Sequence, residues 1–162
     1  MVNLSHAVVD SGQGEDRGKI ACEISERFGA AVDEGDDFSL KIEIAKWHLD
    51  NKRGLTAIIT LTECILDYFS EASGIPRDTR DDDSALRRAI TDFHFPNSLA
   101  SQFVAKYRDE LRGLRNEACH NLTFDKYKEL ELLYNYFSSV YNEHFKNNDD
   151  NYANLQKGFP QK

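Results

Sequence analysis

The spacing of the apolar residues between positions 103 and 122 is the feature that most constrains the fold. They recur at steps of three and four residues, and they are Phe103, Tyr107, Leu111, Leu114, Ala118 and Leu122. On a helix of 3.6 residues per turn, this spacing gathers them within an arc of about 100°. Sustained alternation of apolar and polar residues, which would predict strands, is found nowhere in the sequence. The sequence therefore predicts an all-α protein.

The same spacing predicts helices in the first half of the chain. One covers about residues 15–32, and the next begins near residue 38 behind Asp36 or Asp37 as a possible cap. The apolar stripe of this second helix is Phe38, Ile42, Ala45 and Leu49. The pattern pauses at residues 51–54 and then resumes, which fits either one long kinked helix or two helices. Gly74 and Pro76 are expected to end that element.

Capping residues divide the middle of the chain. A charged stretch, residues 77–83, is expected to form a loop, and Ser84 is expected to cap a short helix that Pro96 closes. Asn97 or Ser98 then caps the long amphipathic helix, which is expected to end near residue 121.

A last helix is expected over about residues 125–145, and the final 16 residues of the chain are predicted not to be helical. Residues 147–162 are polar, show no helical periodicity and include Gly158 and Pro160. The sequence therefore predicts a helical domain over residues 1–146 and a flexible tail over residues 147–162.

Bulk properties narrow the class of protein. A chain of 162 residues is expected to form one domain with a real core. Its charge of −8 argues against a protein that coats nucleic acid non-specifically, since such binding needs clustered Lys and Arg. Three widely spaced cysteines predict reduced thiols rather than disulfides or a zinc site. Without a signal peptide or a long apolar run, a cytoplasmic protein is expected, with no membrane partner.

The polar residues of the long amphipathic helix suggest a chemical site. Arg108, Arg112 and Arg115 follow at i, i+4 and i+7 and would form a basic ridge beside the core face. Asn116 and His120, four residues apart, share another strip of the helix. Arg115 and His120 lie about 140° apart around the axis, so they do not meet side by side in one subunit. A symmetric homodimer that joins two copies of this helix end would bring them into one cleft.

RNA scission by the ribose 2′-hydroxyl suits these residue types. His120 would act as general acid or base because its unperturbed pKa is close to neutral. Arg115 would stabilise the charge on the phosphoryl group, and Asn116 would orient the scissile group. Arg108 and Arg112 are candidate RNA-binding residues. This chemistry requires no metal and no cofactor, and the sequence offers no convincing cluster of metal ligands.

The run from Arg112 to His120, RGLRNEACH, resembles the signature of the HEPN superfamily, in which an Arg and a polar residue are followed by three residues and a His. The resemblance implies a helical bundle of about four to five main helices with a short additional helix. It also implies a homodimer with a composite, metal-independent ribonuclease site for single-stranded RNA. The relatives in question serve prokaryotic defence, either as CRISPR-associated effectors or as toxins paired with antitoxins. A regulatory or antitoxin protein is therefore a possible partner.

Two other interpretations remain open from the sequence. Arg115 and His120 are also ordinary residues for the end of a helix, where they satisfy nearby acids, carbonyl groups and the helix dipole. The chain would then be a non-catalytic helical interaction module, or an adaptor subunit of a larger defence assembly.

Overall fold

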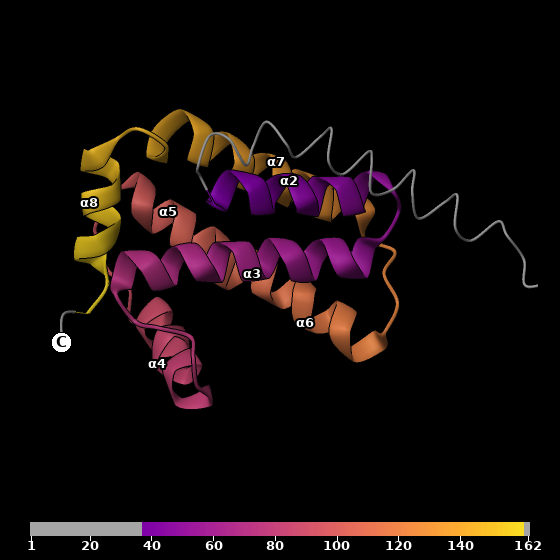
Figure 1. Cartoon of the computed structure of the whole chain (residues 1–162), viewed down its shortest axis with the longest axis horizontal. Helices are drawn as coiled ribbons and strands as arrows, with labels where there is room; N and C mark the ends of the chain where they lie inside the picture. Colours follow the sequence, from indigo (N-terminus) through magenta and orange to yellow (C-terminus); the bar gives the residue numbers. More distant parts are fainter. Residues whose placement is uncertain (1–36, 161–162) are drawn as a thin grey trace, which may run out of the picture. The chain divides into compact units, whose positions relative to one another are not determined.

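The computed structural model describes residues 37–160, and this part of the chain is helical without any strand (Figure 1). The all-α prediction is thus confirmed for these residues. The helices are α2 (Asp37–Asp50), α3 (Gly54–Ser73), α4 (Arg80–Thr91), α5 (Leu99–Lys106), the π-helix η1 (Tyr107–Leu111), α6 (Arg112–Asn121), α7 (Tyr127–Val140), the π-helix η2 (Tyr141–Phe145) and α8 (Asp149–Gly158). The helix predicted over residues 15–32 lies outside the described residues.

Contacts divide the chain into two compact units, Met1–Leu40 and Lys41–Lys162. The second unit holds α3 to α8 and most of α2, and every interaction discussed below lies within it. No helix among residues 37–160 combines the length and the apolar character that crossing a membrane requires.

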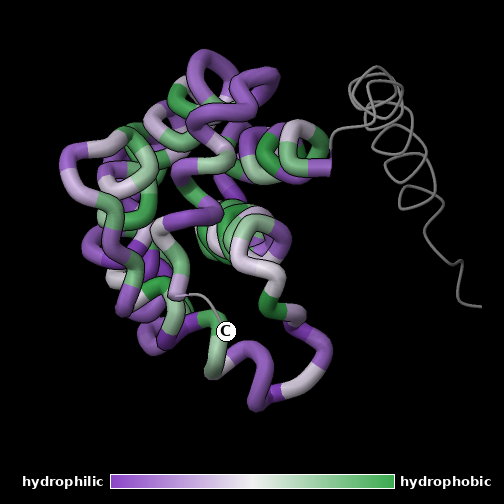
Figure 2. The backbone as a smooth tube through the Cα atoms, turned by 90° about the vertical axis from the view of Figure 1, so that its left-hand side faces the viewer, coloured by the Kyte–Doolittle hydropathy of each residue, from purple (hydrophilic) through white to green (hydrophobic). Residues whose placement is uncertain are grey.

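Helix α3 forms the centre of the second unit. Figure 2 looks along this helix, whose mostly hydrophobic coil is surrounded by other segments. It contacts α4, η1, α6, α7 and α8. Seven of its side chains are at most 1% exposed, and these are Ala57, Ile58, Leu61, Cys64, Ile65, Leu66 and Phe69. A helix that is apolar around most of its circumference is stable only when other helices cover it.

Edge-to-face aromatic pairs join α3 to the later helices. The Phe69 ring lies 5.9 Å from that of Phe103 on α5 and 5.4 Å from that of Tyr107 on η1. Phe103 in turn lies 5.2 Å from Phe137 on α7. Such pairs add to the free energy gained by burying the rings, and they constrain how the helices pack. The helix that carries the candidate site is therefore fixed along its first half.

Local capping residues set several helix ends. Gly74 ends α3 in the left-handed conformation, with φ of 67°, which agrees with the sequence prediction. The Ser98 hydroxyl caps α5 by accepting a hydrogen bond from the Ser101 backbone N–H, so Ser98 rather than Asn97 is the cap. Residues 51–53 separate α2 from α3, which decides in favour of two helices there.

The cap predicted for α4 was wrong. Thr79, not Ser84, caps this helix, and Thr79 forms a reciprocal capping box with Asp82. The helix begins at Arg80, so the loop predicted over residues 77–83 is shorter than expected. A Thr followed three residues later by an acid satisfies two backbone N–H groups at once, which outweighs a single Ser further along.

The prediction of a flexible tail after residue 146 was also wrong, because residues 149–158 form α8. The Asn148 side chain caps this helix, and Leu155 and Phe159 are 0% and 2% exposed. The Phe159 ring packs 5.0 Å from that of Phe93, and the His94 N–H donates to the Gly158 carbonyl at 3.0 Å. Two buried side chains are enough to hold a short polar helix that has no long apolar stripe.

Candidate functional site

The helix that carries the candidate motif runs from Leu99 to Asn121 with a π-helix in the middle. Tyr107 and Leu111, at the two ends of η1, are 1% and 0% exposed. A π-helix accommodates an extra residue in a turn, so the spacing of 3.6 residues does not hold across it. Arg108 lies within this wide turn and Arg112 directly after it, so the straight basic ridge predicted from a regular helix is altered.

Arg115 and Asn116 lie next to each other on the outer surface of α6. The Arg115 Nη1 donates to the Asn116 Oδ1 at 3.3 Å, whereas the Arg115 Nε is buried without a hydrogen-bond partner among residues 37–160. Asn116 is exposed. The terminal nitrogens of the Arg115 guanidinium, rather than its buried Nε, can therefore donate to a further acceptor.

His120 is exposed in the last turn of α6, four residues after Asn116. Within residues 37–160 no hydrogen bond joins it to Arg115, as expected for two positions about 140° apart on a helix. One subunit therefore presents Arg115 with Asn116 and, separately, His120.

Arg108 and Arg112, the two candidate RNA-binding residues, are both partly exposed but differ in their surroundings. The Arg108 Nε donates to the adjacent Asp109 Oδ1 at 2.9 Å, and this bond raises the pKa of Arg108 and lowers that of Asp109. Arg112 lies near Tyr107, whose pKa is raised by burial and lowered in part by the charges of Arg87 and Arg112. Arg108 therefore already has an anionic partner, and an RNA phosphate would have to compete with Asp109 for its guanidinium group.

The last residue of the predicted core stripe is not in the core. Leu122 follows α6 in the left-handed conformation with φ of 53°, and its side chain is 77% exposed. A left-handed conformation is unfavourable for a residue with a Cβ, and glycine is the usual residue at this position. The motif helix thus ends with an exposed leucine in a strained backbone conformation two residues after His120.

The loop after Leu122 is anchored to the start of α3. The Phe124 ring covers Gly54 so closely that a Cβ at Gly54 would overlap it. Tyr127 packs 5.2 Å from Phe124, edge to face, and its hydroxyl donates to the Lys52 carbonyl at 2.6 Å. The end of α6 is thereby held in place although its last residues are exposed.

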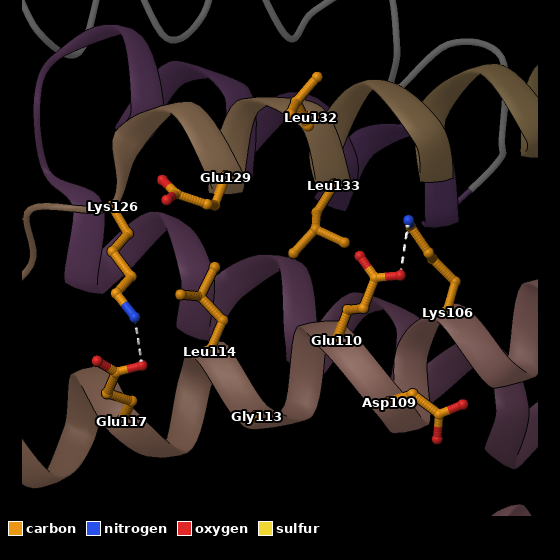
Figure 3. Close-up of a pocket in the computed structure, with 10 residues that line it drawn as sticks. All are labelled: Lys106, Asp109, Glu110, Gly113, Leu114, Glu117, Lys126, Glu129, Leu132 and Leu133. Atoms are coloured by element: carbon orange, nitrogen blue, oxygen red, sulfur yellow. Dashed lines mark hydrogen bonds and ion pairs between the residues drawn. The ribbon is translucent and has the colours of Figure 1, made fainter.

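A groove of about 390 Å³ opens between the motif helix and α7 (Figure 3). Leu114 and Leu133 lie on facing sides of it, and Leu132, which is 70% exposed, lies on its α7 side. The charged residues that line it are four acids, Asp109, Glu110, Glu117 and Glu129, and two bases, Lys106 and Lys126.

Two ion pairs lie at opposite ends of this groove. Lys126 contacts Glu117 at 2.6 Å and so joins the start of α7 to α6, and Lys106 contacts Glu110 at 2.8 Å. The bond to Glu117, with smaller contributions from Glu129 and Asp125, raises the pKa of Lys126. The groove is therefore an acidic environment in which each of the two lysines is already paired.

The groove and the predicted catalytic residues occupy different faces of the helix. A smaller hollow of about 160 Å³ adjoins the end of α6, and neither of these hollows is lined by Arg115, Asn116 or His120. Sequence reasoning missed the groove, although Gly113 within a helical pattern was a signal for a place of close approach. Among residues 37–160, no three His, Cys, Asp or Glu side chains are grouped as a metal site would require.

Comparisons with protein-family models, curated proteins and solved structures give no match for this chain.

Proposed function

We propose that this protein is a metal-independent endoribonuclease that cleaves single-stranded RNA as a homodimer and resembles HEPN-type ribonucleases. The observation that supports this function most directly is that α6 carries all three residues, with Asn116 and His120 exposed and Arg115 partly exposed beside Asn116. The contact of Arg115 with Asn116 at 3.3 Å joins two of the three residues, and His120 follows one turn later.

The chemistry divides among the three residues. The ribose 2′-hydroxyl attacks the adjacent phosphorus, the 5′-oxygen leaves, and a 2′,3′-cyclic phosphate is formed. His120 transfers a proton to or from one of these oxygens, because imidazole exchanges protons near neutral pH. Arg115 donates to the phosphoryl oxygens as negative charge accumulates on them, and Asn116 orients the scissile group. Arg108 and Arg112 bind the RNA chain on either side.

The homodimer is the part of the proposal that brings Arg115 and His120 together. Leu122 supports an interface at this end of α6, because an exposed leucine in a strained conformation gains from burial by a partner. A two-fold axis there places Arg115 of one copy near His120 of the other. The biological setting that we propose is prokaryotic defence, with a regulatory or antitoxin protein that controls the enzyme.

The test is cleavage of a labelled single-stranded RNA by the full chain in excess EDTA. We expect products with 2′,3′-cyclic phosphate ends and no cleavage of an RNA with 2′-deoxyribose at the scissile position. Removal of a general acid or base costs about 10²- to 10⁴-fold in rate, so His120→Ala and Arg115→Ala should lose at least about 100-fold. Matched controls are His94→Ala and Arg88→Ala, which remove an exposed His and an exposed Arg elsewhere.

Sedimentation of the same variants separates catalysis from assembly. The proposal requires that His120→Ala remains dimeric and folded while it loses activity. Cleavage at the wild-type rate in both His120→Ala and Arg115→Ala would show that the activity comes from another site or from a contaminant. A strictly monomeric chain with full activity would refute the composite site.

A further inference from the structure

The groove between the motif helix and α7 lies on a different side of α6 from Arg115. Gly113 and Glu117 line it and are four residues apart, whereas Arg115 is about 200° around the helix axis from Gly113. A ligand in the groove therefore approaches from a side that the proposed ribonuclease site does not use.

The interior of the groove is apolar. Leu133 is 4% exposed and faces Leu114 across the groove, while Leu132, which lines the groove from α7, points away from Leu114 and is 70% exposed (Figure 3). Leu132 and Leu122 are the large hydrophobic residues that remain exposed among those the structure describes. Apolar surface of this kind beside a hollow is typical of a binding site for another protein.

The rim of the groove is acidic. Glu110 and Glu117 each use one carboxylate oxygen in a pair with a lysine, and Glu129 stands on the α7 side near Lys126. These pairs are half exposed and contribute little stability, so a cationic ligand can join or replace the lysines at small cost. Three of the four lining acids are paired, Glu110 with Lys106, Glu117 with Lys126 and Asp109 with Arg108, so Glu129 supplies the net negative charge that favours a positively charged ligand.

Gly113 gives an independent indication that something approaches the helix here. A Cβ at this position would meet no atom within 4 Å, so packing inside the protein does not require glycine. Glycine in a helix costs about 0.5–1 kcal/mol relative to alanine. Because Gly113 lines the open groove and has no side chain, a group from another molecule has room to approach the helix backbone there.

The dimensions suit a helix. The lining residues run from Lys106 to Glu117 along one wall, which is about 16 Å at 1.5 Å per residue. That length accommodates about three helical turns, the span covered by apolar side chains at i, i+4, i+7 and i+11 of a docked helix.

We propose that this groove binds an amphipathic helix of another protein, one whose apolar stripe is flanked by Lys and Arg. The charges exclude other occupants. Residues 1–36 of the same chain do not suit the groove, because they contain eight acids and only three Lys or Arg. A second copy does not suit it either, because two acidic rims would then face each other. RNA is excluded because its phosphates would meet Glu110, Glu117 and Glu129. The inference does not depend on ribonuclease activity.

The test measures fluorescence anisotropy with the full-length chain and a labelled 14-residue peptide. The probe carries Leu at i, i+4, i+7 and i+11 and Lys at the other positions. Leu132→Asp should weaken binding about tenfold or more, because it removes an apolar contact and adds a charge to the interface. Glu129→Lys should weaken it by about threefold to tenfold. Gly113→Leu should block the groove while the helical circular-dichroism spectrum is kept.

Matched variants outside the groove supply the controls. Leu122→Asp alters the other exposed leucine, and Glu131→Lys alters an exposed acid of α7 that does not line the groove. Both should leave the affinity unchanged, and two further peptides, with Glu in place of Lys or with the leucines scattered around the helix, should not bind. The proposal is wrong if Leu122→Asp weakens binding as much as Leu132→Asp, or if the probe does not bind the wild type. It is also wrong if Leu132→Asp dissociates a homodimer, since the groove would then be occupied by a second copy.

Discussion

Helix α8 and the end of α6 differ in how well the apolar pattern of the sequence predicts burial in the structure. Residues 149–158 are polar, yet Phe159 just after them is 2% exposed and packs against Phe69 and Phe93. The last turns of α6 continue the strongest apolar pattern of the chain, yet Leu122 is 77% exposed. Two buried side chains, Leu155 and Phe159, thus fix a polar segment, whereas the last residue of a longer apolar pattern stays exposed because nothing packs against it.

The difference also suggests where binding occurs. The C-terminal helix satisfies its apolar residues within the chain. Leu122 is exposed at the end of the motif helix, and Leu132 of α7 is exposed beside the groove, so two apolar surfaces remain available to other molecules. These two surfaces are the ones to which we assign the homodimer and the partner helix.

The largest effect is expected from Phe159→Ala. Removing a buried phenylalanine costs about 3–5 kcal/mol, because apolar area is lost and a cavity is left against Phe69 and Phe93. For a chain of this size the thermal midpoint should fall by about 6–20 °C. Circular dichroism at increasing temperature measures it, and Lys157→Ala, an exposed change on the same helix, should stay within about 1–2 °C of the wild type. If Phe159→Ala has the same thermal midpoint as the wild type, Phe159 does not anchor α8.

A substitution at Leu122, at the end of α6, is expected to change the free energy of unfolding less and in the opposite direction. Leu122→Gly relieves the left-handed conformation and should stabilise the monomer by about 1 kcal/mol. The same change should weaken the proposed homodimer, because it removes an exposed apolar side chain. Denaturant unfolding and sedimentation equilibrium measure the two quantities separately. A loss of stability without any change in association would show that Leu122 packs within its own subunit.

Glycine substitutions test how the end of α6 is held. At Gly54 a Cβ would overlap the Phe124 ring, so Gly54→Ala should destabilise the chain by about 1–3 kcal/mol. Gly113→Ala is the matched control, since its Cβ meets no atom within 4 Å, and it should stabilise by about 0.5–1 kcal/mol. Urea unfolding of both variants gives the comparison. Equal effects of the two substitutions would mean that Phe124 does not anchor the loop.

The smallest effect is a pH dependence from His48 in the last turn of α2. Burial, and then the charge of Arg53, lower the pKa of His48 below its ordinary value of 6.5. Between the folded and unfolded pKa values the unfolded chain binds more protons, so the free energy of unfolding decreases as the pH falls through 6.5. The thermal midpoint should therefore drop from pH 7.5 to pH 5.5 by more in the wild type than in His48→Gln. An identical drop in both proteins would assign the pH dependence to other groups.

Sequence reasoning identified the helices whose signals are local. Gly74 and Ser98 set helix ends through their own backbone or side-chain hydrogen bonds, and the stripe from Phe38 to Leu49 is buried as its spacing predicts. Arg115, Asn116 and His120 stay predicted site residues, and the expectation that Arg115 and His120 do not meet within one chain agrees with the lack of a hydrogen bond between them among residues 37–160. These results depend on residues a few positions apart, which a helical wheel describes well.

Tertiary structure decided the features that depend on distant residues. The π-helix at 107–111, the anchoring of Phe159 and the exposure of Leu122 all follow from which helices meet at these points. The groove likewise exists only because α7 packs beside the motif helix. Most pairs of residues that face each other across it are 15 or more positions apart in the sequence. The sequence by itself determined the all-α class and the composition of the motif, since periodicity and capping are local. Packing decided which surfaces remain open, because exposure depends on contacts between segments far apart in the chain.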